Sequence, residues 1–289
     1  LRFIWSTLRS HRSGESERLF CGEKNAYGRQ LARVSAILER ETIWSDVFPG
    51  NRHTLHCFKP AVEAAETSLE LAAEQRKRTV WRLDGGSGAD DELCWLLAKG
   101  YHVVAKGLSN RRAEALAAKV RRWDAYQENA WLGEVDPPID YGRPVQVFVK
   151  RRLKDGQYLH SYYISTLSLP SKGCFLHLYD ARGGAEVEQF RNDKNGLNME
   201  ARRKHSFLGQ KGYILLTDLA HNLLADFYHR ALAGTRFEGY GLKRIVRDLL
   251  AMPGKLVFDG QQLVRVELLS QNQFSKDLAI CLERYCSGE

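Results

Sequence analysis

The sequence lacks the features that mark several classes of protein. Its six cysteines are spread through 289 residues and none forms a Cys-x-x-Cys pair. That spacing argues against a disulfide framework and predicts a reducing, cytoplasmic compartment. No apolar run approaches the ~20 residues of a membrane-spanning helix, so we expect no membrane partner. The first residues contain no clean apolar run either, so no signal peptide is predicted, and an opening Leu1 in place of Met suggests a processed or truncated product.

Acidic residues are also fewer than basic ones, 35 against 43. The formal net charge is +8 and the pI is about 9.2, within an ordinary globular composition of 44% hydrophobic and 27% charged residues. A basic balance favours an anionic partner, and nucleic acid is a usual one. Each basic cluster alone is typical of a solvated face, but their number favours DNA binding. The clusters are Arg111 with Arg112, Lys119 with Arg121 and Arg122, Lys150 with Arg151 and Arg152, and Arg202 with Arg203 and Lys204.

The order of strands and helices predicts an α/β layer fold. Residues 28–38, 41–47, 79–83 and 101–105 are expected to form strands, and residues 54–75, 90–98 and 110–123 helices. Residues 145–150 and 158–167 are expected to form antiparallel strands around a turn. A polar helix over 184–194, an apolar helix over 213–232, a helix over 242–251 and a final hairpin complete the prediction. Strands that alternate with helices are typical of a sheet with helical layers.

A run of glycines follows the strand predicted over residues 79–83, in the sequence Arg82-Leu83-Asp84-Gly85-Gly86-Ser87-Gly88. It does not fit a dinucleotide site, because Asp91 stands where the last glycine of Gly-x-Gly-x-x-Gly should be. No P-loop motif is present. Two interpretations remain. Asp84 could cap the next helix, or its carboxylate could hold Mg²⁺ at the end of a strand, together with at least one acid from elsewhere.

Another group of possible metal ligands is weaker. His53, His56 and Cys57 lie close together in the sequence, but no fourth ligand accompanies them. Polar residues that open a helix explain this group better than a zinc site does.

A second acid could come from residues 179–194, which combine acids and bases in one predicted short helix. Tyr179 and Arg182 precede Glu186, and Lys194 follows it. A solvated, salt-bridged helix would explain such a pattern. Acids for a metal and cations for phosphates are also what phosphodiester chemistry requires.

With these stretches together, the chain resembles the DDE transposases of bacterial insertion sequences. Three stretches support the resemblance: residues 82–92 (RLDGGSGADDE), the signature Tyr179-x2-Arg182-x3-Glu186, and the flanking residues 193–197 and 219–223. Together they span most of residues 22–233. The resemblance implies an RNase H-like mixed sheet flanked by helices. It also implies a β insertion between the second acid and the glutamate, and a C-terminal helix and hairpin.

The resemblance also implies a division of the chain and roles for its residues. Residues 1–20 would form an atypical N-terminal segment, 21–124 with 171–234 the catalytic core, 125–170 the β insertion and 235–289 a C-terminal extension. Asp84 and Glu186 would be catalytic acids that hold Mg²⁺, or Mn²⁺ as a substitute. Lys194 falls one residue later than the pattern, so Glu188 stays a rival for Glu186. Residues expected to contact DNA are Tyr179, Arg182, Arg191, Lys194, Lys150, Arg151 and Arg152.

One departure from the family concerns its first acid, which belongs on the opening strand of the sheet. Residues 1–20 contain no Asp, and their only acids, Glu15 and Glu17, begin in a Ser/Gly/Arg stretch unlike a buried strand. A strand over residues 3–8 would present Ser and Thr. Asp46 is a weak substitute, on a strand expected to neighbour the opening one.

These observations leave three functions open. The first is a DNA transposase catalytic domain, incomplete without its first acid, that acts in the bacterial nucleoid as a homodimer on element ends and target DNA. The second is an inactive DNA-binding remnant of such an enzyme. The third is an RNase H-like nuclease.

Overall fold

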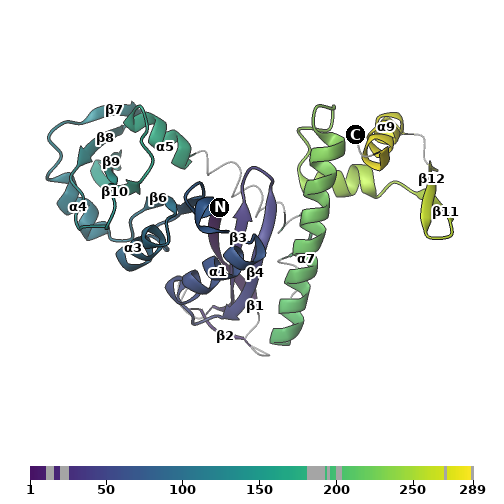
Figure 1. The fold of residues 1–289 in the computed structure, drawn as a ribbon, viewed down its shortest axis with the longest axis horizontal. Helices are drawn as coiled ribbons and strands as arrows, with labels where there is room; N and C mark the ends of the chain where they lie inside the picture. The colour runs from purple at the N-terminus through teal and green to yellow at the C-terminus, as the bar shows by residue number, and fades with distance from the viewer. Residues whose placement is uncertain are drawn as a thin grey trace.

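The computed structural model describes residues 1–10, 16–19, 26–180, 193, 196–199, 204–269 and 272–287. These residues confirm a mixed α/β fold around a ten-stranded sheet (Figure 1). Its strand order is β2-β3-β1-β5-β6-β10-β9-β8-β7, and β4 pairs with β3. The strands of one half are β1 (Arg2–Ser10), β2 (Glu17–Arg18), β3 (Tyr27–Ala36), β4 (Glu41–Pro49), β5 (Val80–Leu83) and β6 (His102–Lys106).

Strand β1 lies at the centre of the sheet, within the range 1–20 that was expected to form an atypical N-terminal segment. It pairs antiparallel with β3 over its whole length and parallel with β5 at Arg2. Phe3 packs into the main core and is 2% exposed, whereas Leu8 packs on the opposite face. Both faces of this strand are covered, so its sequence does not alternate between apolar and polar residues as a half-exposed strand does.

The other half of the sheet is antiparallel. β9 (Gln146–Lys154) and β10 (Gln157–Ser165) form the predicted hairpin, and β10 pairs with β6. Asp155 and Gly156 at its tip have φ values of 51° and 76°, the left-handed backbone that a tight hairpin turn requires. β7 (Asp124–Gln127) and β8 (Ala130–Val135) extend this half and were not predicted.

Helices α1 (Thr54–Ser68), α3 (Asp90–Ala98) and α4 (Asn110–Ala117) cover the main core. The helix predicted over residues 54–75 is interrupted, because Glu70 adopts a positive φ of 50° and α2 (Ala73–Arg76) starts anew. The helix predicted over residues 110–123 ends early, at Ala117. The largest fully buried side chains of this core are Phe3, Phe58, Trp81, Leu83, Leu93, Leu96, Leu97, Tyr101 and Tyr162.

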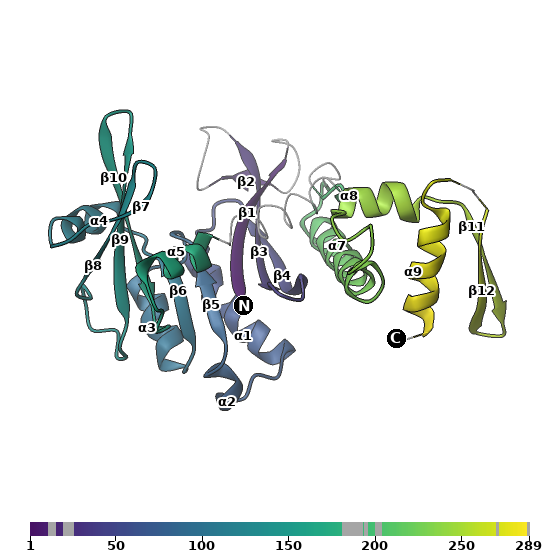
Figure 2. The same cartoon turned by 90° about the horizontal axis from the view of Figure 1, so that it is seen from above.

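Two further helices lie on the opposite face of the sheet. α5 (Lys172–Asp180) packs with Val104, Phe148 and Tyr163. α7 (Phe207–Phe227) packs against β4, and its Ile214 shares a small core with Leu31 of β3. In Figures 1 and 2, α7 stands between this part of the sheet and the C-terminal elements.

The C-terminal elements form a separate core on the end of α7. They are the π-helical turn η1 (Tyr228–Leu232), α8 (Leu242–Arg244), the π-helical turn η2 (Ile245–Leu250), the predicted hairpin β11 (Gly254–Asp259) with β12 (Gln262–Leu268), and α9 (Ser275–Ser287). Phe227, Leu232 and Phe237 lie at its centre with Ile245 and Leu278.

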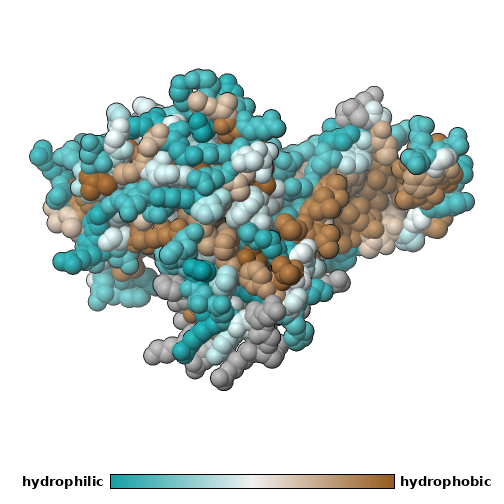
Figure 3. Space-filling view, turned by 60° about the horizontal axis from the view of Figure 1, so that its bottom comes forward, coloured by the Kyte–Doolittle hydropathy of each residue, from teal (hydrophilic) through white to brown (hydrophobic). Residues whose placement is uncertain are grey.

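The outer face of α7 is unusually apolar. Five leucines are between 49% and 77% exposed, namely Leu208, Leu215, Leu216, Leu219 and Leu223. Figure 3 shows a broad apolar area on this side of the molecule, where α7 and the C-terminal elements lie. None of the described helices, α7 included, is long and apolar enough to cross a membrane.

A substitution of Gly88 can test how tightly the loop after β5 is packed. A Cβ atom at this position would lie 1.9 Å from the backbone oxygen of Lys106, so alanine cannot fit without a backbone shift. We expect Gly88→Ala to lower the free energy of unfolding by about 1–3 kcal/mol. Gly212→Ala is the matched control, since that glycine lies inside α7 with nothing within 4 Å of its Cβ position. The control should raise stability by roughly 0.5–1 kcal/mol. Urea denaturation measures both, and equal stabilities for the two variants would contradict the packing described.

Candidate functional site

The strand β5 carries Asp84 to the face of the sheet opposite the main core. Trp81 and Leu83 are fully buried in that core. Successive residues of a strand face opposite sides, so Arg82 lies on the face that α5 and α7 occupy, and the same alternation, continued by one residue past the strand, directs Asp84 to that face. Asp84 is half-buried there, which leaves its carboxylate accessible to a ligand.

The loop after β5 shapes the surroundings of Asp84. The N–H of Gly86 donates to Oδ1 of Asp84 at 3.0 Å, and the N–H of Ser87 donates to the Asp84 carbonyl at 3.1 Å. The carboxylate therefore belongs to a local turn of the Asx kind. The alternative that Asp84 caps the next helix is wrong, because the N-cap of α3 is Ala89, with no side-chain hydrogen bond.

The neighbouring strand β1 supplies no acid to this site. Arg2 pairs with Arg82 in parallel register. Continued by two residues past this pair, the same register would bring Ile4 level with Asp84. The sequence of β1, RFIWSTLRS, contains no carboxylate. Ile4 and Ser6 are both half-buried on this strand.

The strand that carries Asp46 was expected to lie beside the opening strand, and it does not. That strand, β4, pairs with β3, and β3 separates it from β1. The Asp46 carboxylate instead forms an ion pair with Nζ of Lys211 on α7 at 2.8 Å. The expected position was wrong because the chain doubles back, with β3 as the shared partner of both strands.

The remaining acids and several cations of the predicted site lie outside the described residues. These are Arg182, Glu186, Glu188, Arg191 and Lys194, which follow α5 along the chain. The described residues therefore give no distance between Asp84 and any of these five side chains. Within the described ranges, no three His, Cys, Asp or Glu side chains gather closely enough to hold a metal ion.

The described residues expected to contact DNA fall into different environments. Tyr179 is 3% exposed, and its ring stacks on Phe175 and meets Tyr163 edge to face, which leaves little ring surface for DNA. Lys150 lies 3.6 Å from a carboxylate oxygen of Asp180.

Arg151 and Arg152 differ sharply in exposure. The Arg151 guanidinium lies 4.4–5.0 Å from the ring centres of Trp123, Trp131 and Tyr158, an aromatic cage that holds it by cation–π attraction. Arg152, on the next position of the strand, is exposed. It is the better placed of the two to reach a phosphate.

The group of His53, His56 and Cys57 opens a helix, as expected. His53 is the N-cap of α1, and its Nδ1 accepts a hydrogen bond from the N–H of Leu55 at 3.3 Å. Cys57 is buried, and burial raises the pKa of its thiol to about 11. A thiol held protonated in this way is a poor metal ligand.

A buried charge network fastens α7 to the sheet. Arg33 of β3 is 2% exposed and forms ion pairs with both Asp193 and Asp218. Its Nε donates to the Ser45 hydroxyl at 3.1 Å. His221, one turn after Asp218 on α7, pairs through Nδ1 with Asp193 at 2.6 Å. The network thus joins β3, β4 and α7 to Asp193, which precedes α7 in the chain.

Burial and charge pull the ionisation of this network in opposite directions. Burial raises the pKa of the Asp218 carboxyl, and the charge of Arg33 opposes the rise only in part. Burial works against the charged form of His221, but its hydrogen bond to Asp193 and that acid's charge outweigh it, so the pKa of His221 is raised. Both shifts mean that the folded protein holds protons more tightly than the unfolded chain does.

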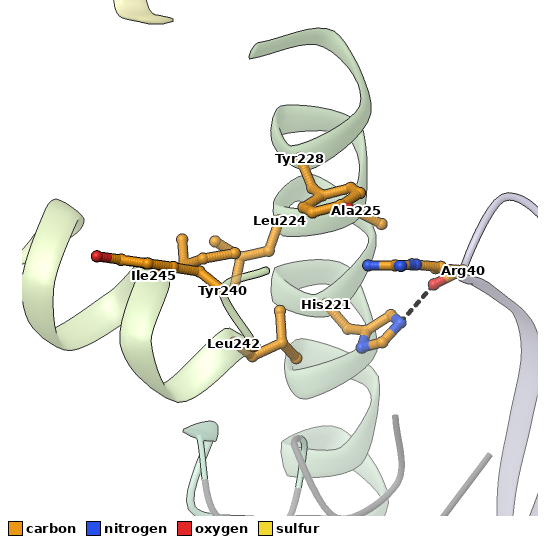
Figure 4. Close-up of a pocket in the computed structure, with 9 residues that line it drawn as sticks. Arg40, His221, Leu224, Ala225, Tyr228, Tyr240, Leu242 and Ile245 are labelled. Atoms are coloured by element: carbon orange, nitrogen blue, oxygen red, sulfur yellow. Dashed lines mark hydrogen bonds between the residues drawn. The ribbon is translucent and has the colours of Figure 1, made fainter. Parts of the chain in front are cut away.

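Two neighbours of this network complete the junction. The Asn222 side chain exchanges hydrogen bonds with the backbone of Thr42 at 2.8 and 2.9 Å, so it extends the edge of β4 as a strand would. A cavity of about 50 Å³ lies beside His221, where the Arg40 guanidinium lies over the ring of Tyr228 at 4.3 Å (Figure 4). The Arg40 carbonyl is paired with Nε2 of His221 at 2.6 Å, so this histidine uses both ring nitrogens.

Two charged residues in apolar surroundings are the sequence signal for this network. Arg33 lies between the apolar residues Ala32 and Val34 of a predicted strand, and Asp218 interrupts a strongly apolar predicted helix. Charges at such positions are seldom fully buried unless they are paired. The sequence does not show that Arg33 pairs with these two acids, because Asp193 and Asp218 are 160 and 185 residues away from it along the chain.

Comparison with known proteins gives a match in structure alone. No family model and no curated protein matches the sequence. A solved structure described as a piggyBac transposase synaptic complex with hairpin DNA is similar, with a TM-score of 0.53 and 13% sequence identity. The match covers 86% of this chain and 50% of that one, so the chain spans about half the length of its neighbour. The chain has a transposase-like fold.

Removal of Arg33 should destabilise the protein strongly. Arg33→Met would leave Asp218 as a buried acid without its cation and Asp193 with His221 alone, and a broken buried pair costs about 3–5 kcal/mol. Arg122→Met is the matched control, because Arg122 also pairs with an acid but is 85% exposed, and an exposed pair contributes little. Urea denaturation should separate the two variants clearly. A loss for Arg33→Met no larger than the control would show that the network does not hold α7 in place.

The raised pKa of His221 predicts a pH dependence of stability. Its stabilising charge is fully present below the unfolded pKa of about 6.5 and is lost as pH rises through the higher folded pKa. The free energy of unfolding should therefore fall as pH is raised above about 6.5. Asp218, also raised, contributes the same sign of slope from a lower pH, and Asp193, Arg33 and Arg40 are the other charged groups that face His221. His221→Gln, which cannot titrate, should flatten the slope, as followed by urea denaturation across this range. An unchanged slope would exclude His221 as its source.

Proposed function

We propose that the chain is the catalytic part of a DNA transposase of the bacterial insertion-sequence DDE type, with an RNase H-like core that lacks its first acid. The observation that carries the proposal is the place of Asp84. It follows a central strand, on a face of the sheet shared with β1, in a fold similar to that of a transposase bound to DNA.

The strand order supports an RNase H-like core. Three antiparallel strands, β1, β3 and β4, are followed by α1 and then by β5 and β6, parallel to β1. In such a sheet, acids from adjacent strands meet where the central strands lie side by side. Ile4 is the residue of β1 that the Arg2–Arg82 register, continued by two residues, would bring beside Asp84, where the missing first acid would stand.

The donor set fits a magnesium ion only in part. Asp84 supplies one carboxylate among the described residues, and Glu186, with Glu188 as its rival, would supply another. Mg²⁺, or Mn²⁺ in its place, is held by one or two carboxylates together with substrate phosphates. When bound, such an ion activates water and stabilises the leaving oxygen of a phosphodiester. Asp84 would position it, with one carboxylate oxygen already held by the Gly86 N–H.

Basic residues would bind the DNA backbone. The net charge of +8 supports a partner that carries many phosphates. Arg152 is exposed. Arg182, Arg191 and Lys194, which lie outside the described residues, are close in sequence to the proposed acids Glu186 and Glu188. These contacts would be tolerant of sequence and sensitive to salt, because phosphates carry no base information.

A DNA-binding remnant without activity is the second candidate. The acid-free sequence of β1 favours it, since loss of a metal ligand removes chemistry and leaves the fold intact. An RNase H-like nuclease is a third candidate, and strand joining in addition to cleavage would distinguish a transposase from it.

The proposal is tested by restoring the missing acid. We expect the chain to bind plasmid DNA carrying the genomic sequence around its own coding region, and to nick it weakly or not at all with Mg²⁺ or Mn²⁺. Ile4→Asp should raise nicking at least about tenfold, since a metal ligand supports several kcal/mol of transition-state stabilisation. Gel analysis of nicked plasmid is the measurement.

Two controls make the result specific. Ile4→Asn has nearly the same shape without the charge and should not raise nicking. Ile4→Asp combined with Asp84→Asn should abolish it. If the combined variant still nicks, or if Ile4→Asp binds DNA but gains nothing, the assignment of Asp84 as a metal-binding acid is wrong.

A further inference from the structure

The hairpin of β11 and β12 is an isolated two-stranded sheet. It stands at the far end of the molecule beside α9 (Figure 2). Leu256 and Phe258 of β11 are 57% and 56% exposed, and Val264 of β12 is 54% exposed. Only Leu268, at one end, packs against the C-terminal core. A two-stranded hairpin is marginally stable by itself, and an unpaired edge is a template for a further strand.

The two edges of this hairpin are not equivalent. A groove of about 400 Å³ runs between β12 and α9, lined by Leu263, Val266 and Leu282 among others. The register also shifts: Val257 lies opposite Arg265 and Phe258 opposite Leu263, so Val264 is an extra residue in β12. Bulges of this kind bend a strand and disrupt pairing. β11 is therefore the regular strand, with the edge better suited to pairing.

The hydrogen-bond pattern shows which groups of β11 are directed outward. The carbonyl of Pro253 accepts from the N–H of Leu269 at 2.9 Å, so the backbone at 253 faces β12. Antiparallel strands alternate inward and outward residues, so the backbone groups at 255 and 257 also face β12. Those of Leu256 and Phe258 are directed away from it.

We propose that β11 is a dimerisation edge, along which two copies of this chain pair antiparallel about a two-fold axis at Val257. In that register Leu256 of one copy lies opposite Phe258 of the second copy. These residues carry the outward backbone groups, so they exchange both hydrogen bonds. Lys255 then lies opposite Asp259. The same strand is complementary to itself in backbone, apolar side chains and charge, as an isologous interface requires.

The charge of the hairpin favours a protein partner over DNA. Lys255 and Arg265 are balanced by Asp259 and Glu267, so the hairpin has no net positive charge to attract phosphates. Pairing produces a four-stranded sheet with the leucines and phenylalanines of both copies on one face. The inference is independent of the proposed function, because no catalytic residue contributes to it.

A charge swap tests the register. Sedimentation velocity of the full chain, without DNA, should show a dimer that forms over concentrations on the order of micromolar. Asp259→Lys places Lys against Lys across the axis and should weaken the dimer at least about tenfold. Adding Lys255→Asp restores opposite charges and should recover it.

The swap separates pairing between copies from effects within one hairpin. Inside the chain Lys255 lies opposite Glu267, so Lys255→Asp would only disturb an isolated hairpin further. Circular dichroism confirms that each variant is folded. A chain that is monomeric throughout, an unaffected dimer in Asp259→Lys, or a double variant without recovery would each overturn the proposal.

A cysteine on the axis gives a second, geometric test. Residues at a non-hydrogen-bonded antiparallel position lie about 4.5 Å apart between Cα atoms, within the roughly 4.4–6.8 Å that a disulfide spans. Val257→Cys, in a chain with Cys21, Cys174 and Cys286 changed to Ser, should therefore form a covalent dimer on mild oxidation. Leu219→Cys, on the exposed face of α7, is the control and should stay monomeric on a non-reducing gel. Cross-linking through Leu219→Cys alone would place the association on α7 and overturn the assignment to β11.

Discussion

The buried pairing of Arg33 with Asp193 and Asp218 is the constraint on which the arrangement of the molecule depends. A guanidinium in a central strand cannot be left without partners in a dry interior. Its two acids come from α7 and from the residues before it, so satisfying Arg33 requires α7 to lie across the sheet. The C-terminal core, which is built on the end of α7, follows from the same attachment.

That attachment also defines the face on which the candidate site lies. The main core fills one side of the sheet, and α5 and α7 occupy the other. Asp84 lies on this second side because Trp81 and Leu83 are committed to the first. Strand β1 is then both a structural centre and a boundary of the site, and its side chains at Ile4 and Ser6 determine what chemistry is available beside Asp84.

The two proposals concern different parts of the molecule and depend on different interactions. The site at β5 depends on whether carboxylates from separate strands meet a metal and a phosphate. The edge of β11 depends on unpaired backbone groups and on a short sequence that is complementary to itself. The proposed dimerisation edge is at the far end of the molecule from Asp84, so pairing along it would not involve the residues around that acid.

Local pattern in the sequence was sufficient for the elements whose periodicity is strong. Helix α3 was predicted with its observed bounds. Both hairpins, β9 with β10 and β11 with β12, were predicted as hairpins, although β9 runs four residues past its predicted end. Asp84 was recognised as a strand-end acid because glycines and an apolar strand flank it. These features depend on side-chain alternation, turn residues and helix dipoles, which act over a few residues.

Tertiary structure alone decided the elements whose burial comes from distant partners. The central place of β1 was not predicted, because both of its faces are covered and its polar residues do not alternate with apolar ones. The separation of Asp46 from β1, the burial of Tyr179 and the pairing of Arg33 with acids far along the chain follow from which strands become neighbours. That choice is made by long-range packing and by the need to satisfy buried charge. The sequence by itself therefore determined the candidate acid and its local turn, and the fold decided what stands beside it.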